Sequence, residues 1–327
     1  MRTTAAPLVL VPEVLPPDWL ASVHAAADVG AFELRDDLDA VLGLELETRR
    51  RVVGLLTLLT RPVDAALLDA FPELRVVSNM AVGFDNVDVP ACTARSIRVG
   101  NTPGVLTDAT ADLAMALLLS AARNLPAASL DAREGRWQTW SPTGWLGLEL
   151  RGATLGVVGL GKIGLAVAQR ARAFGMDILY TRRSDAPAPP ELGATRVELD
   201  ALLARADVVS LHVPLRPDTR HLIDAAALGR MKPSALLVNT ARGDVVDQVA
   251  LQAALEAGQI AGAALDVTSP EPLPPEHPLY QTPGCFIVPH IGSATRATRR
   301  RMAELACANL LAGVRGEALP HAVNGPI

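Results

Sequence analysis

The segment GVVGLGKIGLAVAQRARAFGMDILYTRRS, residues 156–184, determines the expected fold of this chain. A short apolar run leads into the glycines Gly159, Gly161 and Gly164, a helical pattern follows, and a second apolar run ends near Thr181. Gly159 allows a tight turn, Gly161 lets a phosphate approach the backbone, and Gly164 lets the helix pack close to the sheet. Because the start of the helix adds free N–H groups, the segment predicts a dinucleotide-binding βαβ unit.

The residues that follow the second strand indicate which dinucleotide binds. An NAD site usually places a carboxylate there, about 20 residues past the first glycine, to bond the ribose 2′-OH. The chain instead carries Thr181, Arg182, Arg183 and Ser184. Two guanidinium groups and two hydroxyls suit a 2′-phosphate, which a carboxylate would repel. The sequence therefore favours NADPH, and the weaker alternative, NADH, would have to use Asp185.

Composition excludes several classes of protein. The chain has 327 residues, enough for two domains, and its net charge of −5 argues against nucleic acid as a partner. Its three cysteines are odd in number and lack C-x-x-C spacing, which predicts a reducing, cytoplasmic compartment. The apolar run at 113–122 is too short to span a bilayer, so no membrane is expected. No His, Asp or Glu spacing resembles a metal site.

Apolar periodicity predicts an α/β protein with two parallel-sheet units. The first unit is expected to have strands at 8–11, 52–59, 75–79 and 97–99 with helices at 19–27 and 63–70. A long helix at about 107–123 follows, and the second unit has strands at 154–159, 176–181, 207–211, 235–238, 261–265 and 285–288. A last helix covers about 294–311. Two such doubly wound units imply a cleft between them, where the ligands of these sheets bind.

The segment at 125–150 differs from the rest of the chain. A short amphipathic helical pattern leads into a loop that contains Trp137, Trp140 and Trp145, three of the four tryptophans. Exposed aromatic residues clustered on a loop indicate an interface.

Polar residues follow three apolar strands of the second unit, at the sheet edge that faces the cofactor. Arg242 follows the strand at 235–238, Asp266 and Glu271 follow the strand at 261–265, and His290 follows the last strand. These four side chains are therefore expected to converge.

Three motifs identify a resemblance. The segments LDVTSPEPLP (265–274), VPHIGSAT (288–295) and NTPGVLTDATADLA (101–114) resemble the D-isomer-specific 2-hydroxyacid dehydrogenases, most of all the glyoxylate/hydroxypyruvate reductase branch. The resemblance covers nearly the whole chain. Two positions depart from the family pattern: Asp112 stands where glutamate is usual, and Arg216 where threonine is commoner.

The resemblance implies roles for individual residues. Arg242, Glu271 and His290 look like the catalytic set, and Arg242 and His290 also bind substrate. Val82 and Gly83 look like the turn that binds the substrate carboxylate. Trp140 sits where that branch sends a loop tryptophan into the neighbouring subunit's active site, which implies a homodimer. The cofactor contacts expected beyond Gly159, Gly161, Gly164 and 181–184 are Lys162, Ile163, Thr107, His212, Val213, Pro214, Thr219, Asn239, Thr240, Ala241, Asp266 and Gly292.

The resemblance also implies a domain plan. A smaller, flavodoxin-like substrate domain is expected from residues 1–100 together with 290–327. A Rossmann cofactor domain is expected from 101–289, with a dimerisation arm near 125–150.

The expected chemistry can be argued independently of the resemblance. Reduction of a 2-oxo acid needs a cation for the carboxylate and the polarised carbonyl, and arginine suits both. It needs a proton donor that works near neutral pH, which is histidine, and a carboxylate beside that histidine favours its charged form. The hydride comes from the nicotinamide, so NADPH and a small 2-oxo acid would give a D-2-hydroxy acid.

Other interpretations stay open. Arg242 could be an ion-pairing loop residue, Glu271 a solvated turn charge, and His290 an interior histidine. The substrate could be that of a phosphoglycerate dehydrogenase or of a broad-range 2-ketoacid reductase. A formate or phosphite oxidiser is disfavoured by Glu271, which a reaction without a proton relay does not need. A dinucleotide-sensing interaction protein resembling corepressors is the alternative outside the enzymes.

Overall fold

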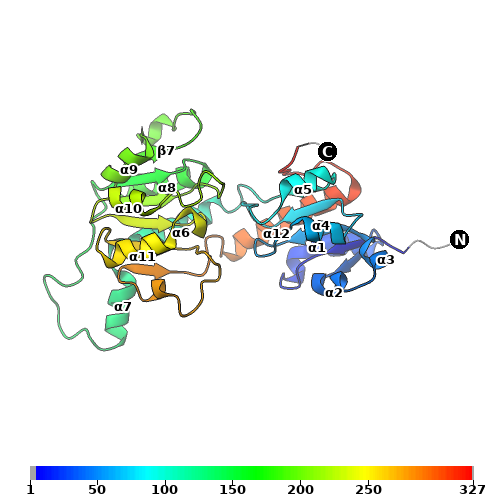
Figure 1. Ribbon diagram of the computed structural model, residues 1–327, viewed down its shortest axis with the longest axis horizontal. Helices are drawn as coiled ribbons and strands as arrows, with labels where there is room; N and C mark the ends of the chain where they lie inside the picture. Colours follow the sequence, from blue (N-terminus) through cyan, green and yellow to red (C-terminus); the bar gives the residue numbers. More distant parts are fainter. Residues whose placement is uncertain (1–4, 326–327) are drawn as a thin grey trace. The chain divides into compact units, whose positions relative to one another are not determined.

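The computed structural model describes residues 5–325, and these divide into two compact units (Figure 1). One unit contains the described residues up to Leu106 together with those from Thr295 onward. The other unit is Thr107–Ala294. Each unit is built on a single parallel sheet, so the expected α/β class with two doubly wound sheets is confirmed.

The smaller unit has a five-stranded sheet in the order β2-β1-β3-β4-β5, in which all neighbours are parallel. This is the flavodoxin-like order. Its strands are β1 (Leu8–Leu10), β2 (Glu33–Arg35), β3 (Val52–Thr57), β4 (Val76–Asn79) and β5 (Arg98–Gly100). Its helices are η1 (Pro17–Leu20), α1 (Ala21–Asp28), α2 (Leu38–Leu42), α3 (Leu46–Arg49), α4 (Ala65–Ala70), α5 (Val89–Ala94) and α12 (Arg296–Arg315).

Helix α12 rests directly on this sheet although it comes last in the sequence. A Cβ on Gly313 would lie 2.4 Å from the Cβ of Val76, so the backbone of α12 touches β4. A Cβ on Gly54 would meet the side chains of Val314 and Leu310 at 2.9 and 3.0 Å. The helix begins later than 294 because the Thr295 side chain accepts a hydrogen bond from the Thr298 N–H and caps it.

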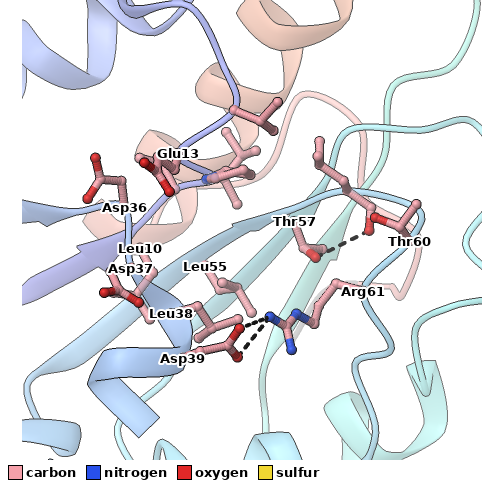
Figure 2. Close-up of a pocket in the computed structure, with 15 residues that line it drawn as sticks. Leu10, Glu13, Asp36, Asp37, Leu38, Asp39, Leu55, Thr57, Thr60 and Arg61 are labelled. Atoms are coloured by element: carbon pink, nitrogen blue, oxygen red, sulfur yellow. Dashed lines mark hydrogen bonds and ion pairs between the residues drawn. The ribbon is translucent and has the colours of Figure 1, made fainter. Parts of the chain in front are cut away.

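A pocket of about 330 Å³ opens at the carboxyl ends of β1, β2 and β3 (Figure 2). It is lined by the strand ends, by residues 11–14 and 36–37, by the first two residues of α2, and by Leu58, Thr60 and Arg61. The sheet order changes direction between β1 and β3, and such switch points are where open α/β sheets leave a crevice. Arg61 closes one side through two 2.9 Å bonds to the carboxylate of Asp39.

The larger unit has a seven-stranded parallel sheet in the order β12-β11-β10-β9-β6-β7-β8. The order reverses between β6 and β9, as in a dinucleotide-binding Rossmann sheet with one added strand. The strands are β6 (Thr154–Val158), β7 (Asp177–Thr181), β8 (Thr195–Arg196), β9 (Val208–Leu211), β10 (Leu236–Asn239), β11 (Gly262–Leu265) and β12 (Cys285–Ile287).

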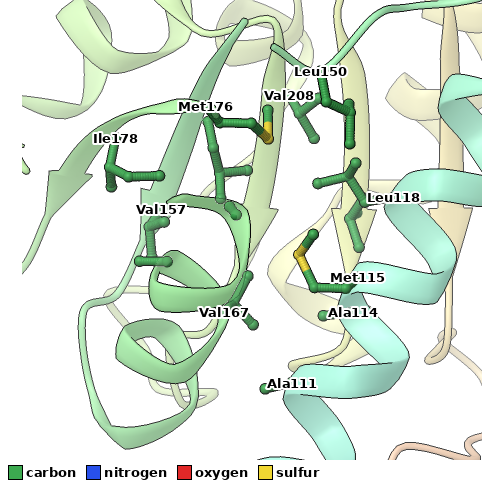
Figure 3. Close-up of a cluster of buried hydrophobic side chains, with 14 of the residues drawn as sticks. Ala111, Ala114, Met115, Leu118, Leu150, Val157, Val167, Met176, Ile178 and Val208 are labelled. Carbon is green, nitrogen blue, oxygen red and sulfur yellow. The ribbon is translucent and has the colours of Figure 1, made fainter. Parts of the chain in front are cut away.

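Helices cover both faces of the larger sheet. The helices of this unit are α6 (Thr107–Ala122), α7 (Leu125–Arg133), α8 (Lys162–Ala173), α9 (Leu199–Arg205), α10 (Ala225–Arg230) and α11 (Gln248–Glu256), with η2 (Pro190–Leu192), η3 (Gly243–Val245) and η4 (Pro278–Tyr280). Met115 and Leu118 of α6 pack with Val157 of β6 on one face (Figure 3). Val158, the next residue of β6, packs with α9, α10 and α11 on the other. Alternate residues of the strand thus serve two hydrophobic cores.

Two strands escape prediction from the sequence. β2 and β8 lie at the edges of their sheets and are mostly exposed, so no apolar run marks them. Among residues 5–325, no single helix is long and apolar enough to cross a membrane. Within the same residues, α6 and α7 together reach the length and apolar composition of a membrane span, but the chain bends by 63° between them. Seven residues of α6 are buried in the described structure.

The Asp207–Lys232 ion pair yields a stability prediction. Asp207 accepts 2.7 Å and 2.8 Å bonds from Lys232 Nζ and the Thr154 N–H. Burial alone would raise the pKa of Asp207, but these bonds outweigh burial and lower the pKa. Asp207→Asn should lower the free energy of unfolding by about 1–3 kcal/mol at pH 7 in urea denaturation.

The sign of the pH dependence follows from the lowered pKa. The stabilisation is complete above the unfolded pKa of about 3.9 and disappears as the pH falls through the lower folded value. The difference between Asp207→Asn and the parent should therefore vanish in acid. Asp200→Asn is the matched control, because Asp200 and Arg230 form an exposed pair at 3.3 Å that contributes about 0–1 kcal/mol. A constant difference down to acid pH would contradict this assignment.

Candidate active site

The glycine turn after β6 is shaped to leave room at the start of α8. A Cβ on Gly159, whose φ is +99°, would lie 2.9 Å from the backbone carbon of His212. A Cβ on Gly164 would lie 2.2 Å from the carbonyl oxygen of Gly159. A Cβ on Gly161 would meet nothing within 4 Å, and no side chain caps α8. The first and third glycines are therefore needed for packing, and the second faces open space into which a phosphate fits.

The exposed Lys162 and the half-buried Ile163 begin helix α8 at this open space. The turn also lies beside the end of β9, at the point where the sheet order reverses. His212 donates its N–H to the Val158 carbonyl at 2.8 Å, and its ring Nε2 lies 2.8 Å from Ser210 Oγ. Burial lowers the pKa of His212 to about 4, so the ring is neutral at pH 7. His212 is thus an uncharged residue beside the glycine turn, and Val213 and Pro214 follow it in the chain.

The Thr219 hydroxyl forms its hydrogen bonds within its own loop. Its hydroxyl donates to the Pro214 carbonyl at 2.6 Å and accepts from the Arg216 N–H at 2.8 Å. The backbone of Arg216 is therefore part of this loop's internal bonding. The adjacent Asp218 carboxylate lies 3.9 Å from Arg183.

The residues after β7 present mostly exposed basic groups. The side chain of Arg183 is 74% exposed. Asp185, the carboxylate that an NAD site would need, pairs with Arg196 at 3.2 Å, and Arg196 also donates to the Arg182 carbonyl at 3.2 Å. The Asp185 side chain is 99% exposed in this pair, and Thr181 and Ser184 flank the two arginines.

The turn after β10 is organised by a buried asparagine. Asn239 donates from Nδ2 to the Arg242 carbonyl at 2.8 Å and accepts from the Ala241 N–H at 3.0 Å. The Arg242 guanidinium donates to the Ala241 carbonyl at 2.8 Å. Thr240 Oγ1 is buried and has no hydrogen-bond partner among the described residues. A buried hydroxyl without a partner fits a site that a ligand completes.

A histidine–carboxylate pair lies beyond the ends of β11 and β12. His290 Nδ1 is 2.5 Å from Glu271 Oε1. His290 has a φ of +51°, a left-handed conformation that is uncommon for a residue other than glycine and that the surrounding structure must enforce. Because Nδ1 is engaged by Glu271, proton exchange with a substrate would fall to Nε2.

Asp266 holds the turn that carries His290. Its two carboxylate oxygens accept 2.6 Å and 2.9 Å bonds from the N–H groups of Ile291 and Gly292, and its carbonyl accepts from the His290 N–H at 2.9 Å. Burial raises the pKa of Asp266, although the two N–H groups and His290 act in the opposite direction. Thr110 of α6 donates to the Gly292 carbonyl at 3.3 Å, and Thr107 begins the same helix.

In the smaller unit, the turn after β4 presents two backbone donors. Asn101 and Asn79 donate side-chain N–H groups to the carbonyls of Val82 and Gly83, at 2.8 and 3.0 Å. The N–H groups of Val82 and Gly83 donate to nothing within residues 5–325. Two adjacent N–H groups with their carbonyls turned to other partners form a ready site for a carboxylate.

The tryptophan segment after α7 is largely exposed. Trp137, Trp140 and Trp145 are 72%, 79% and 48% exposed in the single chain. The described structure therefore leaves a group of large apolar rings uncovered at one segment.

The sequence is similar to that of known enzymes over nearly all of its length. The profile of the D-isomer specific 2-hydroxyacid dehydrogenase, NAD binding domain, matches residues 115–292. The glyoxylate reductase of Korarchaeum cryptofilum is 46% identical over 97% of this chain and 96% of its own length. The chain belongs to the D-isomer specific 2-hydroxyacid dehydrogenases.

Two further relatives are informative for this dehydrogenase. The glyoxylate reductase/hydroxypyruvate reductase of Mus musculus is 46% identical over 95% of this chain and 96% of its own. A crystal structure of an NADPH-dependent glyoxylate/hydroxypyruvate reductase from Sinorhizobium meliloti, in complex with NADP and malonate, is 36% identical. It aligns with a TM-score of 0.86 over 99% of this chain and 100% of that one. The resemblance to the glyoxylate reductase branch is thereby confirmed.

The structure of the dehydrogenase adds residues that sequence reasoning missed. Gln248 contacts the loop that carries Glu271, Asp218 lies beside Arg183, and Ser210 bonds His212. Asp112, the departure from the family pattern, forms a 2.7 Å bond to Arg170 of α8. Three of these four contacts join residues more than ten positions apart, so no local pattern could indicate them.

Proposed function

We propose that this dehydrogenase reduces a small 2-oxo acid, glyoxylate or hydroxypyruvate, with NADPH to give a D-2-hydroxy acid. The observation that carries the proposal is the His290–Glu271 pair, held at the carboxyl edge of a sheet whose glycine turn leaves open space for a dinucleotide. The identity to glyoxylate reductases of two organisms supports the choice of substrate.

The residues that would hold the cofactor all lie in the larger unit. The N–H groups at the start of α8 would bind the pyrophosphate, and the buried hydroxyl of Thr240 would gain a partner. His212, Val213 and Pro214 would border the adenosine half, and Thr107, Ala241, Asp266 and Gly292 the nicotinamide half. When bound, the cofactor supplies the hydride.

The substrate would be held at its carboxylate and its carbonyl. The N–H groups of Val82 and Gly83 would bind the carboxylate, because they are adjacent and donate to nothing in the described structure. Arg242 would contact carboxylate and carbonyl together, since its planar guanidinium presents two donors at once. The positive charge stabilises the negative charge that develops on the carbonyl oxygen.

His290 would supply the proton. Its Nε2–H would donate to the carbonyl oxygen as the carbonyl carbon receives the hydride, so that an alcohol forms and the imidazole is left neutral. Glu271 would stabilise the charged imidazolium before transfer and fix its orientation through the 2.5 Å contact to Nδ1. In the oxidation direction the same nitrogen would accept the proton.

The cofactor choice rests on the end of β7. Arg182 and Arg183 would bind the 2′-phosphate, and Asp185 is already paired with Arg196. Asp218, at 3.9 Å from Arg183, offsets part of that positive charge and would moderate the preference for NADPH.

We further propose that the segment at 125–150 is a dimerisation arm and that Trp140 reaches the substrate site of a second copy. The tryptophan rings of this segment are exposed to water, which is unfavourable for large apolar groups, and a partner subunit would bury them. The cytoplasm is the proposed compartment, because the three cysteines are free thiols and two of them are buried.

Replacing His290 tests the proposed reaction. His290→Ala should lower the kcat of glyoxylate reduction by about 10²–10⁴-fold, the usual contribution of a positioned acid, while NADPH binding measured by fluorescence barely changes. In Glu271→Gln, the fall of activity at high pH should begin at lower pH, because the imidazolium loses its charged neighbour. His277→Ala is the control, since His277 caps a short helix through the Leu279 N–H. Near-normal turnover in His290→Ala would refute the assignment.

Neutralising the arginines after β7 tests the cofactor. Replacing Arg182 and Arg183 by glutamine should weaken NADPH binding by about 1–3 kcal/mol and leave NADH binding nearly unchanged, because charge-assisted bonds to the 2′-phosphate are lost. Arg172→Gln serves as the control, since Arg172 is an exposed arginine of the neighbouring helix α8. Equal kcat/KM for the two cofactors in the parent enzyme would contradict the preference.

The arm can be tested through substrate selection and assembly. Trp140→Ala should improve relative activity on bulky 2-oxo acids such as phenylpyruvate and retain glyoxylate activity, because a large ring would no longer close a small pocket. The change should be graded, since one methylene in such a pocket is worth about 1–3 kcal/mol. Trp137→Ala should leave the substrate profile unchanged. A monomer in light scattering at assay concentration, or an unaltered profile in Trp140→Ala, would count against the arm.

A further inference from the structure

Gln248 makes two hydrogen bonds to one residue of the loop that carries Glu271. Its Oε1 accepts from the Ser269 N–H at 2.9 Å, and its Nε2 donates to the Ser269 carbonyl. Both polar groups of one peptide residue are thus held by a single side chain, two positions before Glu271. An amide can do this because it carries both a donor and an acceptor, whereas an ionised carboxylate has no donor and an ammonium group has no acceptor.

The base of this contact is rigid. Gln248 is the first residue of α11, and the Asp247 side chain caps that helix by accepting from the N–H groups of Val249 and Ala250 at 3.0 and 3.1 Å. The inner face of α11 is buried in the core of the larger unit through Leu251 and Leu255. The backbone from which the Gln248 side chain extends is therefore held by a capped, packed helix.

Close to Glu271 the loop has other anchors besides Gln248, and one of them is the Tyr280 hydroxyl, which donates to the Leu273 carbonyl at 3.3 Å. The backbone of Gly243 is pressed against Thr268, because a Cβ on Gly243 would lie 2.0 Å from the Thr268 carbonyl carbon. Thr268 Oγ1 donates within the loop to the Pro270 carbonyl at 2.9 Å. Besides its 2.5 Å contact with His290, Glu271 accepts a long 3.4 Å bond from the Thr268 N–H of its own loop. Its carboxylate thus depends on how the backbone at 268–270 is held.

Gln248 also relates this loop to the candidate arginine. Gln248 lies six residues after Arg242 in the chain. The turn that follows Arg242 is closed by two backbone hydrogen bonds: the Val245 N–H donates to the Arg242 carbonyl at 3.2 Å, and the Val246 N–H donates to the Gly243 carbonyl at 3.0 Å. The stretch from Arg242 to Val246 is therefore closed by its own backbone bonds, and the amide of the nearby Gln248 ties the Glu271 loop to this segment.

We propose that Gln248 is a positioning residue that holds Glu271 against His290. The inference rests on the proposed function, in which Glu271 orients the proton-donating imidazole. Glu271 and Asp266 are the carboxylates that face His290 from this side, and only Glu271 sits on the segment that Gln248 clamps.

The test compares Gln248→Met with Gln252→Met. Methionine is close to glutamine in length and removes both hydrogen bonds without adding charge. Gln252 is the matched control on the same helix, where its amide bonds the exposed Glu256 at 2.8 Å. In Gln248→Met, the kcat of glyoxylate reduction should fall roughly 10–100-fold, the cost of about an ångström of misplacement, with NADPH binding unchanged. The fall of activity at high pH should shift as it does in Glu271→Gln.

A double-mutant cycle decides whether Gln248 acts through Glu271. In a Glu271→Gln background, Gln248→Met should change kcat by less than about 2-fold, because the group that it positions is already neutral. Gln248→Glu keeps the bond to the Ser269 N–H and should fall between the parent and Gln248→Met.

Two results would overturn the inference. The first is a kcat for Gln248→Met that equals the kcat for Gln252→Met. The second is a double mutant of Gln248→Met and Glu271→Gln whose loss of kcat is the full product of the two single losses. Failure of the proposed function gives a different result from failure of this inference. In that case the His290→Ala and Glu271→Gln variants themselves would reduce glyoxylate at the normal rate.

Discussion

All seven strands of the larger sheet run parallel, so their carboxyl ends share one edge. The candidate residues from Gly159 to Gly292 lie at the last positions of these strands, in the loops that begin at this edge, or in the first turn of α8. The order of strands then adds a second constraint. Because β6 and β9 send their connections to opposite sides, the turn at Gly159 and the backbone at His212 meet where the sheet leaves a crevice. The chemistry depends on this geometry, since residues more than a hundred positions apart reach one place only through it.

Most polar side chains around the candidate site bond to main chain. Asn239 shapes the turn before Arg242, Asp266 holds the turn after His290, and Gln248 holds the loop before Glu271. Buried or half-buried side chains that satisfy backbone groups make loops as precise as strands, because leaving a buried peptide group unpaired is costly. The site is therefore a set of rigid turns that present few reactive groups.

The fold could largely be predicted from apolar patterns. Six strands of the larger sheet and four of the smaller one are buried runs or short apolar segments, and the structure confirms them. Two helices begin later than the sequence predicts, because a side chain caps each of them: Asp64 caps α4 and Thr295 caps α12. β2 and β8 could not be predicted from the sequence, because edge strands that are exposed to solvent need no hydrophobic run.

The sequence by itself determined the class of protein and the dinucleotide turn, and it predicts which groups react. Glycine spacing, strand-end residues and long motifs are local, and local chemistry can be read along a chain. Only the tertiary structure decided how those groups are placed: Asp185 pairs with Arg196, Asp218 lies beside Arg183, and Gln248 forms hydrogen bonds with Ser269. Such contacts join segments that are separate in sequence, and they form because strand order and helix packing bring the segments together, which no local pattern records.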